Sequence, residues 1–558
     1  MRGSGFLKRQ GFLYGSAVLI ASALAVKVLG ALFKIPLANM LGGTGMGYFS
    51  AAYGLFMPIY AVSVTGLPAA VAKAVSARAA GGYDDEAYSV KKTALRLFGA
   101  VGAVSSVILL AGAYPFCRFC SGDIRALPAV MAIAPCLAAG CLVSVYRGYY
   151  EGLRNMYPTA VSQIAEGTAK LVFGLALCYF SISLAQKRPD LFVMLTGCGS
   201  ADDICVDTVI PYAAAAAVLG ITLSSAAGLA YMIWHSRRDE RCIKIISSER
   251  RPIERELLRT AVPASVGALV TNLTSLIDLV TIMNSLRILV KRSPWSFSGL
   301  LSSGIAYDQM PNFIYGSFTG LAVTLFNLVP SVTNMFGKSM LPAAAAAKAA
   351  GDRQALGRCA FGAVLASAMI SVPAGLGMSV LSEEILSLLF SGQTVEIAVC
   401  IRPLKVLGLA VPFLCISSAA FAVLQAADRA DIPVKLMAAG AAVKLAGNLI
   451  LTPLPLMGVT GAAVSTLLCY VIICGASLYC LKKYAYLPIH ETAWTMVRII
   501  ISGILCGICA AAASQMMPQD TRLLERMVFS CGSGCAIYII STYFSGIFTK
   551  STLKMLIS

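Results

Sequence analysis

The sequence GFLYGSAVLIASALAVKVLGALF at residues 11–33 is almost entirely apolar, and Lys27 is its one charged residue. An α-helix of about 20 apolar residues crosses a hydrocarbon core of about 30 Å. The stretch therefore predicts a membrane-spanning helix. Its apolar run is long and no small-residue cleavage pattern follows it, so we expect a permanent helix and not a cleaved signal peptide.

Similar stretches recur along the chain. Of the 558 residues, 58% are hydrophobic and only 13% are charged, and the mean hydropathy is +0.79. Soluble proteins carry about 25% charged residues, so we predict an all-α membrane protein with no soluble domain. We expect fourteen transmembrane helices. They lie at about 11–33, 47–67, 95–115, 127–146, 159–184, 209–234, 261–286, 305–331, 359–381, 404–427, 436–452, 459–480, 494–514 and 527–548.

The Lys and Arg residues predict the orientation of these helices. More than half of the 44 fall between spans on the same side as the N-terminus, and the segment 235–260 is the richest. The loop 185–208, on the other side, holds four aspartates. Because basic loops stay in the cytoplasm, we expect both termini to be cytoplasmic. This distribution also accounts for the net charge of +18, and we expect no nucleic-acid partner.

Matching segments indicate an internal duplication. The sequence LPAA at Leu67–Ala70 recurs at Leu341–Ala344, and Lys170 recurs as Lys444 at the same separation. We predict two homologous six-helix bundles, at 1–234 and 261–482, with a charged cytoplasmic linker at 235–260. Two extra C-terminal helices lie in 483–558. Each half has an even number of spans, which gives a parallel repeat, and transporters of this kind bind substrate between their halves.

Basic residues within the spans are candidates for binding substrate. Lys27, Lys170 and Lys444 lie near the middle of their spans, where each costs about 2.5–3.5 kcal/mol on insertion scales. We therefore expect them to face protein or a water-filled cavity. Lys34 follows Lys27 on a similar face of the first helix. The two would form a cationic strip suited to phosphate.

Simpler interpretations stay open for several of these residues. Glu166 precedes Lys170 by one turn and is placed to neutralise it. Lys34 is placed to extend its ammonium group to the membrane interface. Asp278 is suited either to a coupling cation or to pairing with a lysine.

The 18 cysteines show no disulfide or zinc framework. Most lie within apolar helices, where free cysteine behaves as a small hydrophobic residue. Cys117 and Cys120 form a C-x-x-C, and Cys198 and Cys205 share a loop. We interpret both as free thiols without functional weight.

Three stretches resemble a known family: VKVLGALFKIPLANMLGGTGMGYF from Val26, GLPAAVAKAVSARAAGG from Gly66 and YRGYYEGLRNMYPTAVSQIAEGTAK from Tyr146. They are similar to the multidrug/oligosaccharidyl-lipid/polysaccharide flippase superfamily. Within it they resemble the stage V sporulation protein B and lipid II flippase group of polysaccharide biosynthesis proteins. The resemblance extends over the chain in span number and duplication, with its most specific motifs in the first half.

This resemblance implies a MATE-like bundle with a central cationic cavity in a bacterial cytoplasmic membrane. It implies a flippase that moves an undecaprenyl-pyrophosphate-linked glycan or a peptidoglycan precursor, lipid II, from the inner to the outer leaflet by alternating access. Lys27 corresponds to the cavity arginine of the family. The implied partners are that lipid-linked substrate, membrane lipids and a cell-wall or polysaccharide synthase that serves the wall or sporulation. The protein is expected to be a monomer.

The resemblance also implies a monovalent cation site. Related flippases hold sodium between their seventh, eleventh and twelfth spans. Asp278 and Asn448 match that pattern, and Thr452 stands where an acidic ligand is usual. Na⁺ or H⁺ is therefore the expected coupling ion, and no other cofactor is expected.

Two other functions compete with a flippase. The alternative is a MATE-type cation-coupled drug antiporter, which would bind cations on intramembrane carboxylates, whereas the first span carries Lys27. A membrane enzyme would need acidic residues in the first outer loop or an intramembrane histidine. Residues 35–46 contain no acidic residue, and His235 and His490 fall at the ends of spans. We therefore expect no enzyme activity.

Overall fold

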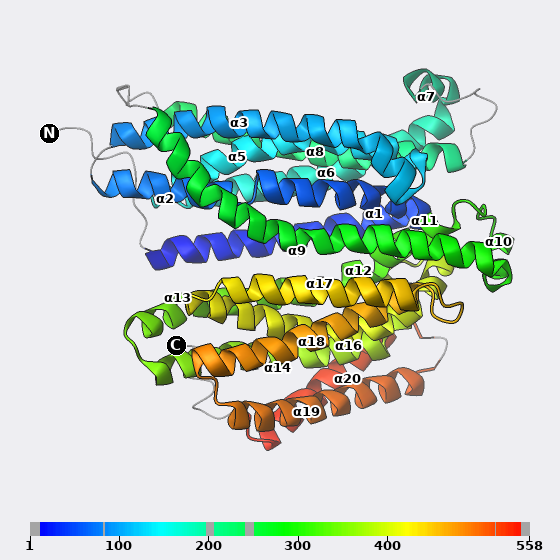
Figure 1. The fold of residues 1–558 in the computed structure, drawn as a ribbon. Helices are drawn as coiled ribbons and strands as arrows, with labels where there is room; N and C mark the ends of the chain where they lie inside the picture. Colours follow the sequence, from blue (N-terminus) through cyan, green and yellow to red (C-terminus); the bar gives the residue numbers. More distant parts are fainter. Residues whose placement is uncertain (1–11, 82–83, 197–205, 240–249, 519–520, 548–558) are drawn as a thin grey trace. The chain divides into compact units, whose positions relative to one another are not determined.

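The computed structural model describes residues 12–81, 84–196, 206–239, 250–518 and 521–547. Within this part of the chain, thirteen helices are long and apolar enough to cross a membrane. The prediction of an all-α, multi-pass protein is confirmed (Figure 1). Contacts divide the chain into two compact units, Met1–Val280 and Thr281–Ser558, each of which is described separately.

The first unit is built from long helices joined by short turns. Its helices are α1 (Phe12–Ser63), α2 (Leu67–Ala80), α3 (Asp84–Pro115), α4 (Leu127–Ile133), α5 (Pro135–Gly152), α6 (Tyr157–Lys187), α7 (Pro189–Thr196), α8 (Val206–Asp239) and most of α9 (Arg250–Arg292). A π-helical turn at Phe116–Ser121 and a 3₁₀ turn at Ile124–Ala126 lead from α3 into α4.

Helix α1 is twice as long as a single membrane span needs. It is broken at Gly42, whose φ of 62° and ψ of −174° lie outside the helical range. Glycine adopts a positive φ without steric cost, so the chain kinks there and continues. The segments before and after Gly42 are about 45 Å and about 30 Å long at 1.5 Å per residue. The first helix runs further than the predicted 11–33, and Lys34 lies within it.

Close contacts between small residues hold the first unit together. Helices α6 and α8 cross where Gly174 and Gly220 meet, and a β-carbon added at Gly220 would lie 2.5 Å from the backbone of Gly174. Apolar side chains of α2, α3 and α5 form a shared core that includes Phe98 and Tyr150. The start of α9 joins this core through Leu257, while α3, α5 and α8 run side by side (Figure 1).

The second unit contains the end of α9 and the remaining helices. These are α10 (Ser298–Ser302), α11 (Met310–Ser317), α12 (Val323–Phe326), α13 (Leu328–Ala349), α14 (Arg353–Val380), α15 (Ser382–Leu389), α16 (Thr394–Ala426), α17 (Asp431–Leu451), α18 (Val459–Ala485), α19 (Ile489–Met516) and α20 (Leu523–Phe544). A 3₁₀ turn at Pro294–Phe297 precedes α10, and a π-helical turn at Phe318–Ala322 lies between α11 and α12.

The predicted span 305–331 is segmented in the structure. Residues 305–309 form turns, and α11, the π turn and α12 follow one another before α13 begins at Leu328. Pro311 is placed in the first turn of α11, where proline is tolerated. Asn327 separates α12 from α13. The predicted span therefore corresponds to Met310–Asn334, which is long and apolar enough to cross a membrane, but its helix is interrupted.

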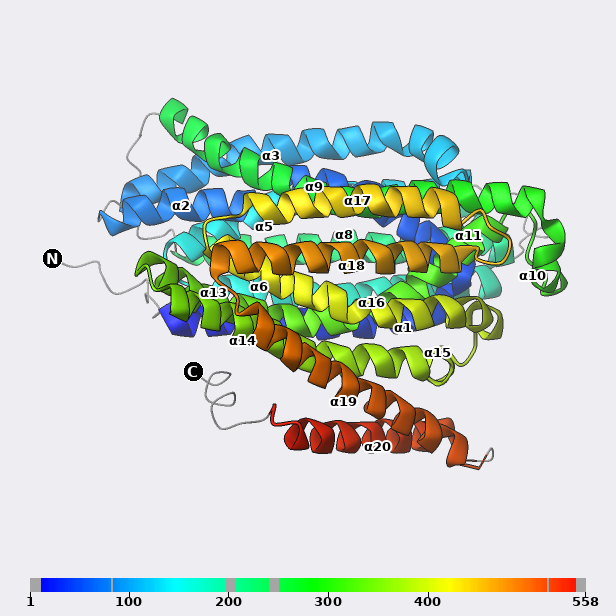
Figure 2. The same cartoon turned by 60° about the horizontal axis from the view of Figure 1, so that its bottom comes forward.

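Helices α19 and α20 lie at the edge of the second unit. Helix α19 packs on α14 and α20 packs on α19 (Figure 2). The core of this unit lies instead among α13, α14, α16 and α18, where Val364, Ala420 and Leu481 are fully buried.

The two units repeat the same pattern of helix packing. In the first unit α2 packs on α5, α3 on α5 and α6 on α8. In the second, α13 packs on α16, α14 on α16 and α17 on α18. Phe98 of α3 and Phe361 of α14, which belong to a segment repeated in the sequence, are both core residues.

The predicted linker 235–260 falls partly in helices. Residues 235–239 end α8 and 250–260 begin α9, while 240–249 lie outside the described residues. Cys198 and Cys205 also lie outside the described residues. Cys117 is buried, Cys120 is partly buried, and both are free thiols.

Candidate functional site

Lys170 projects from the middle of α6 into a group of aromatic side chains of α1. Its Nζ donates a hydrogen bond to Tyr53 Oη at 3.1 Å. The same ammonium group lies 5.0 Å from the ring centre of Phe33 and 5.6 Å from that of Tyr53. Aromatic faces attract cations by about 0.5–2 kcal/mol. These contacts partly compensate the removal of the Lys170 charge from water.

Glu166, one turn before Lys170, forms its ion pair with another residue. Its Oε2 lies 2.8 Å from Nη2 of Arg147 on α5. Ser225 of α8 donates a hydrogen bond to Glu166 Oε1 at 3.0 Å, and Arg147 Nε donates to Ser162 Oγ at 2.9 Å. The Glu166 carboxylate of α6 is therefore held by partners on α5 and α8, and the Lys170 ammonium bonds to Tyr53 instead.

Arg147 was missed as a site residue by the sequence. It immediately follows the predicted span 127–146 and was assigned to a cytoplasmic loop. In the structure α5 continues to Gly152, so Arg147 is still helical and partly buried. The polar residues around Glu151 made the span appear to end before Arg147, and this concealed the continuation of the helix. A basic residue close to the end of a span can therefore belong to the helix and pair with an acidic residue of a neighbouring helix, as Arg147 does with Glu166.

Lys27 and Lys34 both belong to α1. Seven residues apart, they lie about two turns and about 10 Å from each other along one helix face. Lys34 is close enough to both Lys170 and Lys27 for their positive charges to repel its own. The structure thus brings together the three lysines that the sequence singled out in the first half.

The packing of α1 leaves its lysine face beside the contact with α6. Ser22 Oγ donates to Gln163 Oε1 at 3.1 Å, and a β-carbon at Gly174 would lie 2.5 Å from the Phe33 ring. These contacts define the face of α1 that α6 covers. Lys27 is exposed and Lys34 is partly buried, and among the described residues neither has a hydrogen bond or an ion pair.

This lysine cluster, Lys27, Lys34 and Lys170, is suited to a multiply charged anion. Like charges within a membrane-spanning region repel each other and are each costly to desolvate. A phosphate group placed between them relieves the repulsion and accepts charge-assisted hydrogen bonds, which are about twice as strong as neutral ones. An organic cation would instead be repelled by the three lysines.

The second unit contains Lys444 in different surroundings. It is a partly exposed residue of α17. One turn later Asn448 is fully buried, and its Nδ2 donates to Thr281 Oγ1 of α9 at 3.1 Å. Thr452 at the end of α17 is also fully buried, and its hydroxyl has no hydrogen-bond partner among the described residues. A buried hydroxyl without a partner costs about 1–3 kcal/mol.

The three predicted cation ligands belong to different units of the chain. Asp278 is a partly buried residue of α9 in the first unit, one turn before Thr281, which belongs to the second. Asn448 and Thr452 belong to the second unit. All three supply oxygen atoms, the donors that hard cations prefer. Within the described residues, no three His, Cys, Asp or Glu side chains lie together as metal ligands would.

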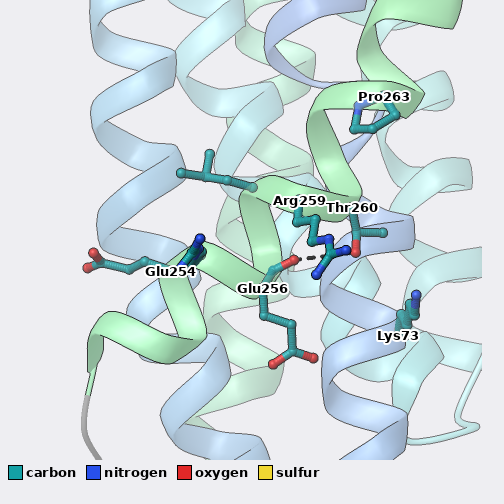
Figure 3. A pocket seen from close by; sticks show the side chains of 8 residues that line it. Lys73, Glu254, Glu256, Arg259, Thr260 and Pro263 are labelled. Atoms are coloured by element: carbon teal, nitrogen blue, oxygen red, sulfur yellow. Dashed lines mark hydrogen bonds between the residues drawn. The ribbon is translucent and has the colours of Figure 1, made fainter.

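A large pocket in the first unit is built differently. It lies between α2 and the first turns of α9 and has a volume of about 1620 Å³. Lys73 lines it from α2, while Arg259 and Glu256 line it from α9 (Figure 3). Glu256 Oε2 accepts a hydrogen bond from Arg78 Nη2 at 2.9 Å, which ties α9 to α2. Its charges alternate in sign, so it favours a polyanion less than the lysine cluster does.

Two family models match the chain. The family described as polysaccharide biosynthesis protein matches residues 12–186, and the family described as lipid II flippase MurJ matches residues 204–524. The chain is 22% identical to stage V sporulation protein B of Bacillus subtilis (strain 168) over 563 residues, which is 98% of each chain. It is 25% identical to lipid II flippase MurJ of the same organism over 186 residues, 31% of this chain and 33% of that one.

Solved structures share the fold. A lipid II flippase MurJ in an inward closed conformation superposes with a TM-score of 0.67 at 13% identity, covering 96% of this chain and 99% of that chain. An inward-facing multidrug resistance MATE family transporter gives a TM-score of 0.60 at 12% identity, covering 86% and 98%. The MATE-like fold expected from the sequence is therefore confirmed.

Proposed function

Because this chain belongs to the lipid II flippase MurJ family, we propose that it moves a lipid-linked glycan or peptidoglycan precursor across a bacterial cytoplasmic membrane. The proposed substrate carries an undecaprenyl pyrophosphate and passes from the inner to the outer leaflet. The family is one of transporters, not of enzymes.

The lysine cluster of the first unit is the observation that supports this substrate class. Lys27 and Lys34 are cations in a membrane-spanning helix and have no ion pair among the described residues, and Lys34 lies close to both Lys27 and Lys170. A pyrophosphate would supply the missing counter-charge. Lys444 is proposed to meet the same headgroup from the second half of the chain during alternating access.

The proposed architecture has fourteen crossings. The break of α1 at Gly42 divides the first long helix into two segments, each long enough to span. The repeated packing pattern supports two homologous lobes, 1–234 and 261–482, with 235–260 as a cytoplasmic linker and a final helix pair in 483–558. Both termini are placed in the cytoplasm by the distribution of Lys and Arg. Cysteine-accessibility labelling of 235–260 from outside would overturn this topology.

A monovalent cation is proposed as the coupling ion. Asp278, Asn448 and Thr452 would hold it, and the buried Thr452 hydroxyl without a described partner fits an oxygen ligand. When bound, the cation would supply a positive charge that links α9 to α17. The Asn448–Thr281 hydrogen bond already orients the two helices toward each other within the second unit.

Depletion followed by mass spectrometry tests the function. Cells that depend on this protein should accumulate its lipid-linked substrate on depletion, and the mass of that lipid distinguishes lipid II from another glycan carrier. Comparing growing and sporulating cells separates a role in the vegetative wall from one in sporulation. Crosslinking in the same cells tests for an associated synthase and for a monomer.

A reconstituted assay separates the flippase from its alternative. Proteoliposomes should translocate a fluorescent lipid II analogue and leave ethidium untouched. A MATE-type drug antiporter would show the reverse, with cation-driven ethidium transport. That outcome would contradict the proposal, because the charge of the lysine cluster repels organic cations.

A further inference from the structure

A second pocket lies wholly within the second unit, away from the lysine cluster in sequence. It has a volume of about 550 Å³, which is within the range of about 300–1,000 Å³ typical of small-molecule sites. Its walls come from the end of α9, from α10 and α11, from the first turns of α16, and from the turn that joins α17 to α18.

The lining of this pocket carries a single charge. Leu286, Ile314 and Val399 represent its apolar walls, and Arg402 is its one charged residue. No carboxylate lines it within the described chain. The acidic residues nearest in sequence, Asp308 and Glu396, are outside the lining.

Arg402 is available for a ligand. It is exposed, it lies in the third turn of α16, and no described residue forms a hydrogen bond or an ion pair with it. A guanidinium group presents a planar pair of donors that matches a phosphate. The hydroxyl groups of Thr394 and Thr460 also line the pocket and offer polar contacts to a headgroup.

The rim of the pocket includes an exposed apolar residue, Leu456, in the turn between α17 and α18. Residues 452–458 form a tight turn, in which the amide groups of Met457 and Gly458 both donate to Leu454 O at 3.0 and 2.9 Å. Gly458 has a φ of 48°, which favours glycine. Leu456 at the tip is 91% exposed. A leucine held out at the end of two spans is stabilised when it enters a lipid interface.

We propose that this pocket binds an anionic phospholipid from the adjoining leaflet, with the lipid phosphate on Arg402 and an acyl chain along the apolar wall. With the proposed orientation, that leaflet is the outer one. Zwitterionic lipids also carry a phosphate, but their ammonium group finds no carboxylate in this pocket. The uncompensated Arg402 charge therefore selects lipids with net negative charge, such as phosphatidylglycerol.

Native mass spectrometry of the full-length protein in detergent tests this site. Phosphatidylglycerol should remain bound to wild type, with phosphatidylethanolamine retained about tenfold less. Arg402→Met should lower phosphatidylglycerol retention about tenfold, as expected for a lost charge-assisted hydrogen bond. Arg522→Met removes an exposed arginine outside the pocket and should change nothing.

A second variant abolishes the selectivity between the two lipids and keeps Arg402. Ala398 is exposed one turn before Arg402, and Ala398→Glu places a carboxylate at the i,i+4 position. It should release phosphatidylglycerol and bring phosphatidylethanolamine to an equal level. Equal retention of both lipids by wild type would overturn the proposal, and so would undiminished phosphatidylglycerol retention by Arg402→Met or by Ala398→Glu. Inorganic phosphate should not displace the lipid; displacement at millimolar concentration would show a simple anion site.

Discussion

The corresponding lysines of α6 and α17, Lys170 and Lys444, have different surroundings in the two units. In the first unit Lys170 bonds to Tyr53 and lies over two aromatic rings, and Lys34 and Lys27 add charge beside it. In the second unit Lys444 is partly exposed, and the buried polar residues near it are the neutral Asn448 and Thr452. If the two halves are homologous as proposed, the lysine kept its position while its surroundings diverged, toward the proposed anion site in one half and the proposed oxygen ligands in the other.

The largest effect is expected from breaking the support of the lysine cluster. Arg147→Met leaves the Glu166 carboxylate without its ion pair, and loss of one partner of a buried pair costs about 3–5 kcal/mol. Because Glu166 is partly exposed, we expect about 3 kcal/mol. Thermal unfolding in detergent measures this loss.

The double variant Arg147→Met, Glu166→Gln provides the control. It removes both charges and should recover most of the stability, because no unpaired carboxylate remains. A single variant as stable as wild type would show that the network of α5, α6 and α8 is not needed to hold α6.

Lys27→Met should have the largest effect on transport. It keeps the length of the side chain and removes a charge that no described residue pairs. Loss of a charge-assisted hydrogen bond to phosphate lowers transport by about 10- to 100-fold. Lys27→Arg should retain part of the activity, and Lys482→Met, an exposed lysine outside the cluster, should be neutral. Wild-type flipping by Lys27→Met with normal protein levels would remove Lys27 from the site.

Replacing the two corresponding lysines sharpens the comparison directly. Lys170→Met should lower transport by about tenfold, since it removes a charge from the lysine cluster. Lys444→Met should lower transport only about threefold, because Lys444 is not part of the lysine cluster. Flipping rates measured side by side in proteoliposomes decide this. Equal losses would mean that the two halves contribute symmetrically to the headgroup site.

The sequence predicted the class of the fold, and it singled out the lysines of the proposed site, for identifiable reasons. A lysine within an apolar helix is conspicuous, so Lys27 and Lys170 were found by their cost alone. The partner of Glu166 was not, because the i,i+4 rule favoured Lys170 and the true partner, Arg147, comes from another helix. Tertiary pairing of this kind leaves no periodic signal in one sequence.

The segmentation of 305–331 was hidden for a similar reason. Hydropathy averages over a window, so it recognises that Met310–Asn334 is apolar without registering the π turn and the interruption at Asn327. The kink at Gly42 inside α1 was recognised only as a gap between two spans. Apolar content is determined by the bilayer, but helix breaks depend on local packing.

The smallest effect concerns the oxygen ligands of the second unit. Thr452→Val preserves shape and removes a buried hydroxyl that has no described partner. Without Na⁺, the variant should be as stable as wild type or more stable by about 1 kcal/mol, because an unsatisfied polar group disappears. With Na⁺, wild type should gain stability according to the ligand's binding to the folded state, and the variant should gain less. Melting temperatures in Na⁺ and in K⁺ measure both effects. Thr542→Val provides the control, because Thr542 is a fully buried threonine of α20 outside both proposed sites, and its replacement should leave the response to Na⁺ unchanged. A wild type that is indifferent to Na⁺, together with a stabilised Thr452→Val, would show that the hydroxyl is only a packing defect. The second half would then differ from the first by having lost charge without acquiring a cation site.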